Sequence, residues 1–412
     1  MELGLYKSMC LVLKRCWYGT RYAGQAFEFA VRDNFVENDF VQGSFSPCVY
    51  RHKTRKLWYF VHGDDYVGIG SETDLEWYRT QVSKRFIMKL RGYLGPSSRH
   101  KQEMRILNRV LTWRVADASR NEPEMLTYEA DQRHADLLVG DYGLEMGKSK
   151  GRTSPWDKPT YMSRHPLAGP LLSPPDARRF RSSCMRHIFL ALDRPDLQFV
   201  AKEISRAMAT PTINADETLK GVARYLLTKP RLRWRYPRQA MPSKVVGLAD
   251  ANWAGCPVTR KSTGCTHLML GRHPIFAGSA TQTIISLSSG ESEFYSAVRG
   301  ACRLLGLVAL MADLGFNMAA ELGTDSTAAK GLASRRGAGG VRHIHCPALW
   351  LQQAIAQRRL TIVKRPGATI SPDIGTKAGI SAPKQWDLLS RFGCVRAGGR
   401  SNTALDVAGA RA

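Results

Sequence analysis

The chain has 412 residues, of which 43% are hydrophobic. It is therefore long enough for two or three domains with cores of their own and too apolar to be a disordered chain. Sixty Lys and Arg residues against 35 Asp and Glu give a formal net charge of +25. An excess of this size favours a polyanionic partner, and we expect nucleic acid rather than a surface whose charge serves only solubility.

The cysteines and the apolar runs bear on compartment. Nine cysteines are scattered without a Cys-x-x-Cys pair, which argues against a disulfide framework and a zinc ribbon and is typical of a reducing compartment. No apolar run reaches the roughly 18 residues that a membrane helix needs. The start of the chain, MELGLYKSMCLVLKRC, lacks the features of a signal peptide. We therefore expect an intracellular protein, cytoplasmic or nuclear and not secreted, without a membrane partner.

The first part of the chain mixes helical and strand patterns. Apolar residues at helical spacing predict a helix within residues 21–38. The runs LWYFV (57–61) and YVGIG (66–70) flank a short polar break that holds Asp64 and Asp65. Aromatic and β-branched runs around such a break predict a β-hairpin, with the two aspartates at its tip.

Further elements follow before a change in composition. Thr73 and Glu76 form a capping-box pattern that predicts the start of a helix. Residues 103–132 have the pattern of a second hairpin, and a helix is expected over 132–139. Residues 150–175 then carry six prolines, which is typical of an extended connector.

Helical patterns return over residues 176–236, and a new unit begins near residue 241. A strand that ends in an acidic residue opens this unit, and further strands precede a long helix with a capping box at Ser288 and Glu291. The unit continues with a strand, an acidic turn and a helix over 319–334, then with a helix and a strand over 348–367. This order predicts an α/β fold with a mixed sheet covered by helices. From about residue 395 the Gly/Ala/Arg-rich tail is expected to be disordered.

Four carboxylates lie at the ends of elements in this last unit: Asp250, Glu293, Asp325 and Asp373. Strand ends and helix starts on one edge of a sheet can converge. Converging carboxylates repel one another, and a divalent cation relieves that repulsion. Oxygen-only ligands favour Mg²⁺ or Mn²⁺ over zinc, and two such ions can drive phosphodiester cleavage. Each of these residues taken singly is more often a cap or a turn residue.

Several blocks of the unit are similar to the ribonuclease H domain of copia-type long-terminal-repeat retrotransposons, in the same order. They are LADANWAGCPVTRKSTGC, SLSSGESEFYSA, GTDSTAAKGLAS and RHIHCPALW…TIVKRPGATISPDIGTK. The resemblance implies that Asp250, Glu293, Asp325 and Asp373 are catalytic metal ligands, with Glu291 as the competitor of Glu293. In the block RHIHCPALW, His343 is kept, whereas His345 and Leu349 replace the family's Asp and second His. For His343 and His345 we expect a phosphate or helix-cap contact rather than metal binding.

The front half resembles the reverse transcriptase of the same family. The blocks are LVLKRCWYGTRYAGQAFE, FSPCVY, YFVHGDDYVGIG, LDRPDLQFVAKEISRAM and TLKGVARYLLT. The resemblance implies that Asp64 and Asp65 are two of the three Mg²⁺-binding carboxylates of a polymerase palm. The third comes from an upstream strand in the family, and no Asp precedes Asp33 here. We therefore expect the fingers and the first palm strand to be missing.

These blocks predict an α+β palm and thumb remnant followed by a ribonuclease H-like domain. The expected divisions are a partial palm over 1–145, a connector and helical thumb or connection region over 146–240, the ribonuclease H-like domain over 241–394, and a tail over 395–412. The implied partners are an RNA·DNA hybrid, an RNA template, a DNA primer and the rest of a retroelement polyprotein. We expect lost polymerase activity with retained hybrid cleavage. The alternative is an inactive nucleic-acid-binding remnant.

Overall fold

The structure of the protein, a computed structural model, describes residues 16–17, 19–117, 119 and 123–405. Three predictions concern residues outside these ranges. They are the absence of a signal peptide, the first part of the block that begins at Leu11, and the end of the tail. Contacts divide the chain into two compact units. The first unit contains the residues up to Arg91 together with Ala309–Asn317, and the second contains Gly92–Val308 and the residues from Met318 on. These units do not coincide with boundaries at 145 and 240, and the assignment of ranges to palm, thumb and ribonuclease H stays a prediction.

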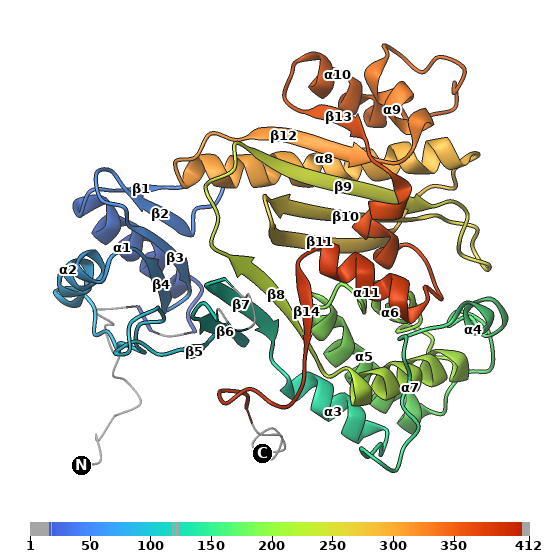
Figure 1. Cartoon of the computed structure of the whole chain (residues 1–412), viewed down its shortest axis with the longest axis horizontal. Coiled ribbons are helices and arrows are strands. Elements are labelled where there is room, and N and C mark those ends of the chain that lie inside the picture. Colours follow the sequence, from blue (N-terminus) through green and yellow to red (C-terminus); the bar gives the residue numbers. More distant parts are fainter. Residues whose placement is uncertain (1–15, 18, 118, 120–122, 406–412) are drawn as a thin grey trace, which may run out of the picture. The chain divides into compact units, whose positions relative to one another are not determined.

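Among its described residues, the first unit contains a four-stranded antiparallel sheet, the helices α1 (Ala23–Glu37) and α2 (Glu72–Ser83), and the last residues of the helix α8 (Ser289–Asp313) (Figure 1). The strand order is β1 (Phe40–Gln42), β2 (Val49–His52), β3 (Trp58–His62) and β4 (Asp65–Ile69). Phe35 of α1 is fully buried and stacks on Tyr50 of β2 and Tyr78 of α2. The predicted helix and the predicted hairpin of β3 and β4 are both confirmed.

The start of α2 differs from the prediction. Ser71 is the N-cap residue, and its hydroxyl oxygen accepts a hydrogen bond from the backbone N–H of Asp74 at 3.1 Å. The capping box predicted at Thr73 and Glu76 is therefore wrong by two residues. The Asp74 carboxylate accepts a hydrogen bond from the Ser71 hydroxyl at 2.8 Å, so Asp74 takes the place expected for the box's acidic residue.

A five-stranded mixed sheet forms one part of the second unit. Its strand order is β11 (His273–Thr281), β10 (Thr263–Leu270), β9 (Lys244–Asn252), β12 (Ala319–Thr324) and β13 (Thr361–Lys364). The first three strands pair antiparallel, whereas β9, β12 and β13 run parallel. The helix α8 (Ser289–Asp313) lies along this sheet (Figure 1). A Cβ at Gly300 of α8 would meet Leu322 and Ala249 of the strands at 3.2–3.3 Å, so a glycine permits this close approach. The predicted mixed α/β sheet is confirmed.

A second five-stranded sheet in this unit is entirely antiparallel. Its strand order is β14 (Cys394–Ala397), β8 (Arg231–Pro237), β7 (Met125–Ala130), β6 (Arg109–Arg114) and β5 (Glu103–Ile106). Three strands therefore replace the predicted hairpin of 103–132, because Leu107 and Asn108 both adopt positive φ and turn the chain. The strand β8 lies where helix was expected, and β14 lies where the disordered tail was expected to begin. Both depend on partners distant in the sequence.

Helices make up the rest of the second unit. A hydrophobic core that includes Leu138, Phe180, Ile204 and Leu226 joins the first group, which comprises α3 (Arg133–Asp141), α4 (Lys158–Ser163), α5 (Pro174–Ala191), α6 (Gln198–Ser205) and α7 (Ile213–Thr228). The later elements are α9 (Thr327–Ser334), η2 (Cys346–Leu349), α10 (Trp350–Ala356), η3 (Gly367–Thr369), η4 (Ser371–Gly375) and α11 (Ala382–Arg391). The predicted helices after residue 132 and over 176–228 are thus present, and the proline-rich connector contains the short α4.

The helix α8 bears on the membrane prediction. By length and composition alone, α8 is long and apolar enough to cross a membrane. Its side chains Phe294, Ala297, Ala301 and Leu304 are fully buried, and the core helix of a folded domain has the same composition. A single helix of this kind is weak support for a membrane span.

Candidate active site

Three of the four predicted carboxylates come together in the second unit. One carboxylate oxygen each from Asp250, Glu293 and Asp325 lie within 4.8 Å of one another. Asp250 lies in β9, two residues before the strand ends, and Asp325 directly follows β12. These strands are parallel neighbours, so both residues reach the same edge of the sheet, where the second turn of α8 supplies Glu293.

Burial and mutual repulsion set the protonation of this cluster. Asp250 and Glu293 are buried. Burial raises the pKa of Asp250, and the charges of Asp373 and Asp325 add to that rise while Lys377 opposes it. Burial also raises the pKa of Glu293, and the charges of Asp250 and Asp325 act in the same direction. Among the described residues, Glu293 Oε2 has no hydrogen-bond partner. This buried acceptor among like charges fits a site for a cation.

Neighbouring groups fix the cluster in place. The Thr376 hydroxyl donates a hydrogen bond to Asp250 Oδ2 at 2.5 Å, and the Ser296 hydroxyl donates to the Asp250 carbonyl oxygen at 2.7 Å. A Cβ at Gly367 would lie 2.8 Å from Asp325 Oδ2, so the backbone passes close beside that carboxylate. Hydrogen bonds from Thr376 and Ser296 therefore hold Asp250, and the backbone at Gly367 packs against Asp325.

Asp373 lies outside the group of three. It belongs to η4, and Lys377 donates to Asp373 Oδ1 at 2.5 Å. Its charge nevertheless acts on Asp250, so it is close to the cluster. Sequence reasoning did not assign roles to Thr376 and Lys377, although both belong to the block Pro372 to Lys377 that resembles the family. Their position in that block is the signal that would have identified them.

Glu291 has a different role from Glu293. The Ser288 hydroxyl oxygen accepts a hydrogen bond from the Glu291 N–H at 3.2 Å, and the Glu291 carboxylate accepts one from the Leu287 N–H at 2.8 Å. This residue caps α8, as the sequence predicts, and it also lies 3.0 Å from His343 Nε2. The backbone N–H of His345 donates to the Tyr295 hydroxyl at 3.1 Å. The expected helix-cap contact is thus found for His343.

Asp64 and Asp65 form a separate pair in the first unit. Asp64 lies in the turn between β3 and β4, whereas Asp65 begins β4 and pairs with His62 in the register, and both are exposed. Neither belongs to a group of three possible metal ligands among the residues that the structure describes. The hairpin tip is as predicted, and the pair lacks a third carboxylate within this part of the chain.

No protein-family model matches the chain. The Retrovirus-related Pol polyprotein from transposon RE2 of Arabidopsis thaliana is 25% identical over 309 residues, which are 74% of this chain and 20% of that protein. The corresponding polyprotein from transposon RE1 of the same plant is 28% identical over 130 residues, 32% of this chain and 9% of that protein. The chain thus spans a fifth or less of the length of these relatives.

A solved structure of the foamy viral protease-reverse transcriptase in complex with dsDNA is also similar. It covers 86% of this chain and 60% of its own chain, with 10% identity and a TM-score of 0.46. A similarity of this degree carries no functional conclusion.

Proposed function

The chain belongs to the copia-type retrotransposon Pol polyproteins, and from this premise we propose that it cleaves the RNA strand of RNA·DNA hybrids in a reaction that depends on a divalent metal ion. The observation that carries the proposal is the convergence of Asp250, Glu293 and Asp325, whose oxygens lie within 4.8 Å of one another at one edge of the mixed sheet. The similarity to Pol polyproteins supports the substrate class.

The donor set decides the metal. Asp250, Glu293 and Asp325 offer oxygen atoms, and the proposed ligands are these three residues, with Asp373 beside them. Oxygen donors without Cys or His favour Mg²⁺ or Mn²⁺. Such ions activate a water molecule and stabilise the leaving oxygen in phosphodiester cleavage.

The protein's own groups prepare the site for this reaction. Thr376 holds one oxygen of Asp250 and leaves the other available, while Ser296 fixes the backbone of the same residue. Lys377 pairs with Asp373 and offsets part of the negative charge. The raised pKa of Asp250 and Glu293 means that protons compete with the metal at these carboxylates, so metal affinity rises with pH.

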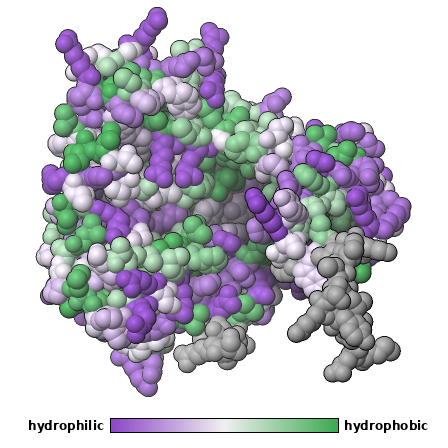
Figure 2. All heavy atoms as spheres, turned by 180° about the vertical axis from the view of Figure 1, so that it is seen from behind, coloured by the Kyte–Doolittle hydropathy of each residue, from purple (hydrophilic) through white to green (hydrophobic). Residues whose placement is uncertain are grey.

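The partner follows from charge. A net charge of +25 suits a backbone of phosphates, whose neutralisation releases counterions. Hydrophilic residues are spread over the face in Figure 2, with hydrophobic residues in small patches between them. We propose an RNA·DNA hybrid as the substrate, an intracellular location, and the remainder of a polyprotein as a further partner.

The polymerase activity of the family is proposed to be lost. Asp64 and Asp65 are exposed, and no third carboxylate joins them among the described residues. We therefore propose that the protein still binds template and primer and does not add nucleotides. The second candidate function is an inactive nucleic-acid-binding remnant, which shares this absence of polymerase activity and also lacks cleavage.

A cleavage assay separates the two functions. The wild-type chain, Asp250→Asn and Asp387→Asn are incubated with a hybrid labelled on its RNA strand, with Mg²⁺, with Mn²⁺ or with a chelator. Asp387 is a matched control, because it is an exposed carboxylate of the same unit that pairs with Arg391 at 2.9 Å. We expect cleavage by the wild type and by Asp387→Asn, and none by Asp250→Asn or with the chelator.

Two outcomes contradict the proposal. Equal cleavage by Asp250→Asn shows that the named carboxylates are not the active site. Hybrid binding without cleavage by any form, in both metals, supports the inactive remnant.

A further inference from the structure

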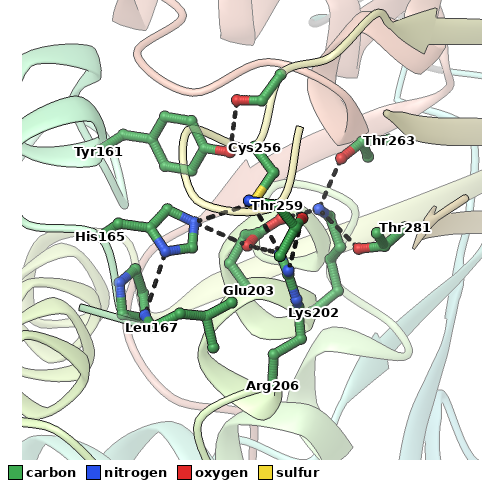
Figure 3. A network of polar contacts seen from close by, with 12 residues as sticks. Tyr161, His165, Leu167, Lys202, Glu203, Arg206, Cys256, Thr259, Thr263 and Thr281 are labelled. Carbon is green, nitrogen blue, oxygen red and sulfur yellow. Dashed lines mark hydrogen bonds and ion pairs between the residues drawn. The ribbon is translucent and has the colours of Figure 1, made fainter. Parts of the chain in front are cut away.

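A second polar cluster lies in the second unit, apart from the carboxylates (Figure 3). It contains His165 from the loop after α4, Glu203 from α6 and Cys256 from the loop between β9 and β10, all buried. One potential ligand atom from each lies within 4.8 Å of the others. One His, one Glu and one Cys are also the ligands of transition-metal sites. The hydrogen bonds of these residues show whether the cluster is a metal site or a network of ion pairs.

The hydrogen bonds of His165 argue against a metal. The Leu167 N–H donates to His165 Nδ1 at 3.1 Å, so this nitrogen carries a lone pair. In a neutral imidazole the proton then lies on Nε2, which faces Glu203 Oε2 at 3.2 Å. A metal would need the lone pair of Nε2. The Glu203 carboxylate is also already paired, with Arg206 Nη1 at 2.7 Å and with Lys202 Nζ.

The surroundings of the Cys256 sulfur are those of an anion. Arg206 Nη1 and the Thr259 N–H both lie 3.4 Å from Sγ, and His165 Nε2 lies 3.8 Å from it. All three groups are donors, and donors of this kind favour a thiolate over a thiol.

Charge balance leads to the same protonation state. Glu203 is an anion, whereas Lys202 and Arg206 are cations, and Lys202 packs over the ring of Phe199 and bonds to Thr263 at 2.7 Å. Burial lowers the pKa of Lys202, whereas the charge and the hydrogen bond of Glu203 act to raise it. With Lys202 protonated and a neutral thiol, this buried network would carry one unpaired positive charge, which is costly in a protein interior. With a thiolate it contains two anions and two cations.

The other buried cysteines provide a contrast. Burial raises the pKa of Cys184, Cys265 and Cys394. Burial also acts to raise the pKa of Cys256, but the hydrogen bonds from Thr259 and Arg206 outweigh it, and the pKa is lowered. The groups that face Cys256 are His165 from one loop, Lys202, Glu203 and Arg206 from α6 and its end, and Tyr161 from α4.

The loop that carries Cys256 is strained. Residues Ala254 and Arg260 adopt φ of 49° and 57°, a left-handed conformation that costs free energy for residues other than glycine. The loop is held from outside by Arg206, which donates to Thr259 Oγ1 at 3.2 Å, and by the Tyr161 hydroxyl, which donates to the Gly255 carbonyl oxygen at 2.9 Å. The same loop leads away from the strand that carries Asp250.

We propose that Cys256 is a buried thiolate that completes an ion network with Glu203, Lys202 and Arg206, and that this network fixes the loop 253–262 beside the carboxylate cluster. Cys256 is thus a positioning residue for the chain leaving β9. The connection to cleavage rests on the proposed function, whereas the ionisation and the anchoring of the loop do not.

The ionisation is tested on the wild-type protein. Ultraviolet thiolate absorbance at neutral pH, compared between native and denatured protein without metal, is expected to show one extra thiolate per chain in the native state. The signal should disappear in Cys256→Ser and persist in Cys184→Ser. No native thiolate overturns the proposal. Stoichiometric Zn²⁺ binding that Cys256→Ser abolishes overturns it too, because the site would then be a metal site.

The anchoring is tested by hydrogen exchange of the loop amides. The Cys256 N–H donates to the Lys261 carbonyl oxygen and the Arg260 N–H to the Cys256 carbonyl oxygen. We expect their exchange to be about tenfold faster in Cys256→Ser than in the wild type or in Cys184→Ser. Because the folded pKa is lowered, the wild-type loop should loosen when the pH falls through that pKa, beyond the intrinsic change of exchange with pH.

The two proposals fail in distinguishable ways. Unchanged loop exchange in a folded Cys256→Ser overturns the anchoring, whatever the chain cleaves. If the wild-type chain cleaves no hybrid, the thiolate absorbance and the loop exchange still decide the inference. If it cleaves, Cys256→Ser should lower kcat with little change in KM, since the loop positions Asp250 and does not itself hold the substrate.

Discussion

Glu293 is buried in α8 with one carboxylate oxygen, Oε2, that has no partner among the described residues. Its pKa and that of Asp250 are raised, first by burial and then by neighbouring carboxylates. In the folded, metal-free protein these groups therefore keep protons that the unfolded chain has lost. Such a pair contributes stability below the ordinary carboxyl pKa, and this contribution is lost as the pH rises through the raised values.

The first prediction concerns this pH dependence. With a chelator present, we expect the free energy of unfolding to fall as the pH rises above about 4.5, by up to about 1.4 kcal/mol per pH unit for each group that still holds its proton. In Glu293→Gln the fall should be smaller, and stabilisation by Mg²⁺ should be lost. Denaturant unfolding at several pH values measures both. Glu217→Gln is the control, because Glu217 is exposed and pairs with Arg164; an equal effect there would contradict the assignment.

Lys377 supplies the second prediction at this scale. Its ammonium group pairs with Asp373 at 2.5 Å, and the charges of Asp250 and Asp325 also act on it. Two unit charges about 4 Å apart interact by about 1 kcal/mol when water screens them fully. Lys377→Gln should therefore lower the Mg²⁺ concentration for half-maximal thermal stabilisation by about threefold to tenfold. Lys384→Gln, which removes a half-buried lysine of the same unit that donates to the Ala368 carbonyl oxygen, should not.

At the scale of elements, the start of α2 offers a matched pair of substitutions. Ser71 caps the helix through the Asp74 N–H, while Thr73, to which the sequence pattern pointed, has no such contact. The loss of an N-cap hydroxyl costs about 1 kcal/mol. We expect Ser71→Ala to lower the stability of the first unit by that amount and Thr73→Ala to change it little. Urea unfolding with a probe in this unit measures the difference, and equal effects would show that the cap lies elsewhere.

The elements that the sequence predicts are those with local signals. Helix α8 has a cap at Ser288 that can be read from four consecutive residues, and the hairpin of β3 and β4 has two apolar runs beside a polar turn. Strand β8 alternates Arg with Leu, Trp and Tyr, a strand pattern that the expectation of helix up to residue 236 overlooked. Strand β14 has only four residues and pairs with β8 across some 160 residues, as in Cys394 with Trp234, so no local pattern predicts it. Such pairings are decided by tertiary contacts.

The distinction between local and distant signals also applies to the residues of the carboxylate cluster and of the cluster around Cys256. Asp250 and Asp325 follow from the rule that parallel strands end at one edge of a sheet, and the similarity of sequence blocks favoured Glu293 over Glu291. His165, Glu203 and Cys256 belong to three separate segments, and no spacing connects them. The block Pro372 to Lys377 already indicates that Thr376 and Lys377 belong to the site, and the structure adds which carboxylates they contact, Asp250 and Asp373.

At the scale of the whole molecule, the excess of positive charge determines how the protein binds nucleic acid. Neutralised phosphates release counterions, so the logarithm of the affinity falls linearly with the logarithm of the salt concentration. With several phosphate contacts, we expect the affinity for an RNA·DNA hybrid to fall on the order of a thousandfold between about 50 and about 200 mM salt. A weak salt dependence would contradict a role for the net charge of +25.

The last prediction separates binding from chemistry with one arginine. Arg342 is exposed and directly precedes His343, which contacts the capping Glu291 of α8. If the loop before His343 follows the hybrid backbone, Arg342→Ala should reduce the salt slope of hybrid binding by about 1. Arg391→Ala, which removes an arginine already paired with Asp387, should leave the slope nearly unchanged.

Asp250→Asn should abolish cleavage and keep the full slope, because phosphate neutralisation depends on the cations and not on the carboxylates. A slope that falls with Asp250→Asn would mean that this aspartate acts by holding the fold together, and its role as a metal ligand would lose its support.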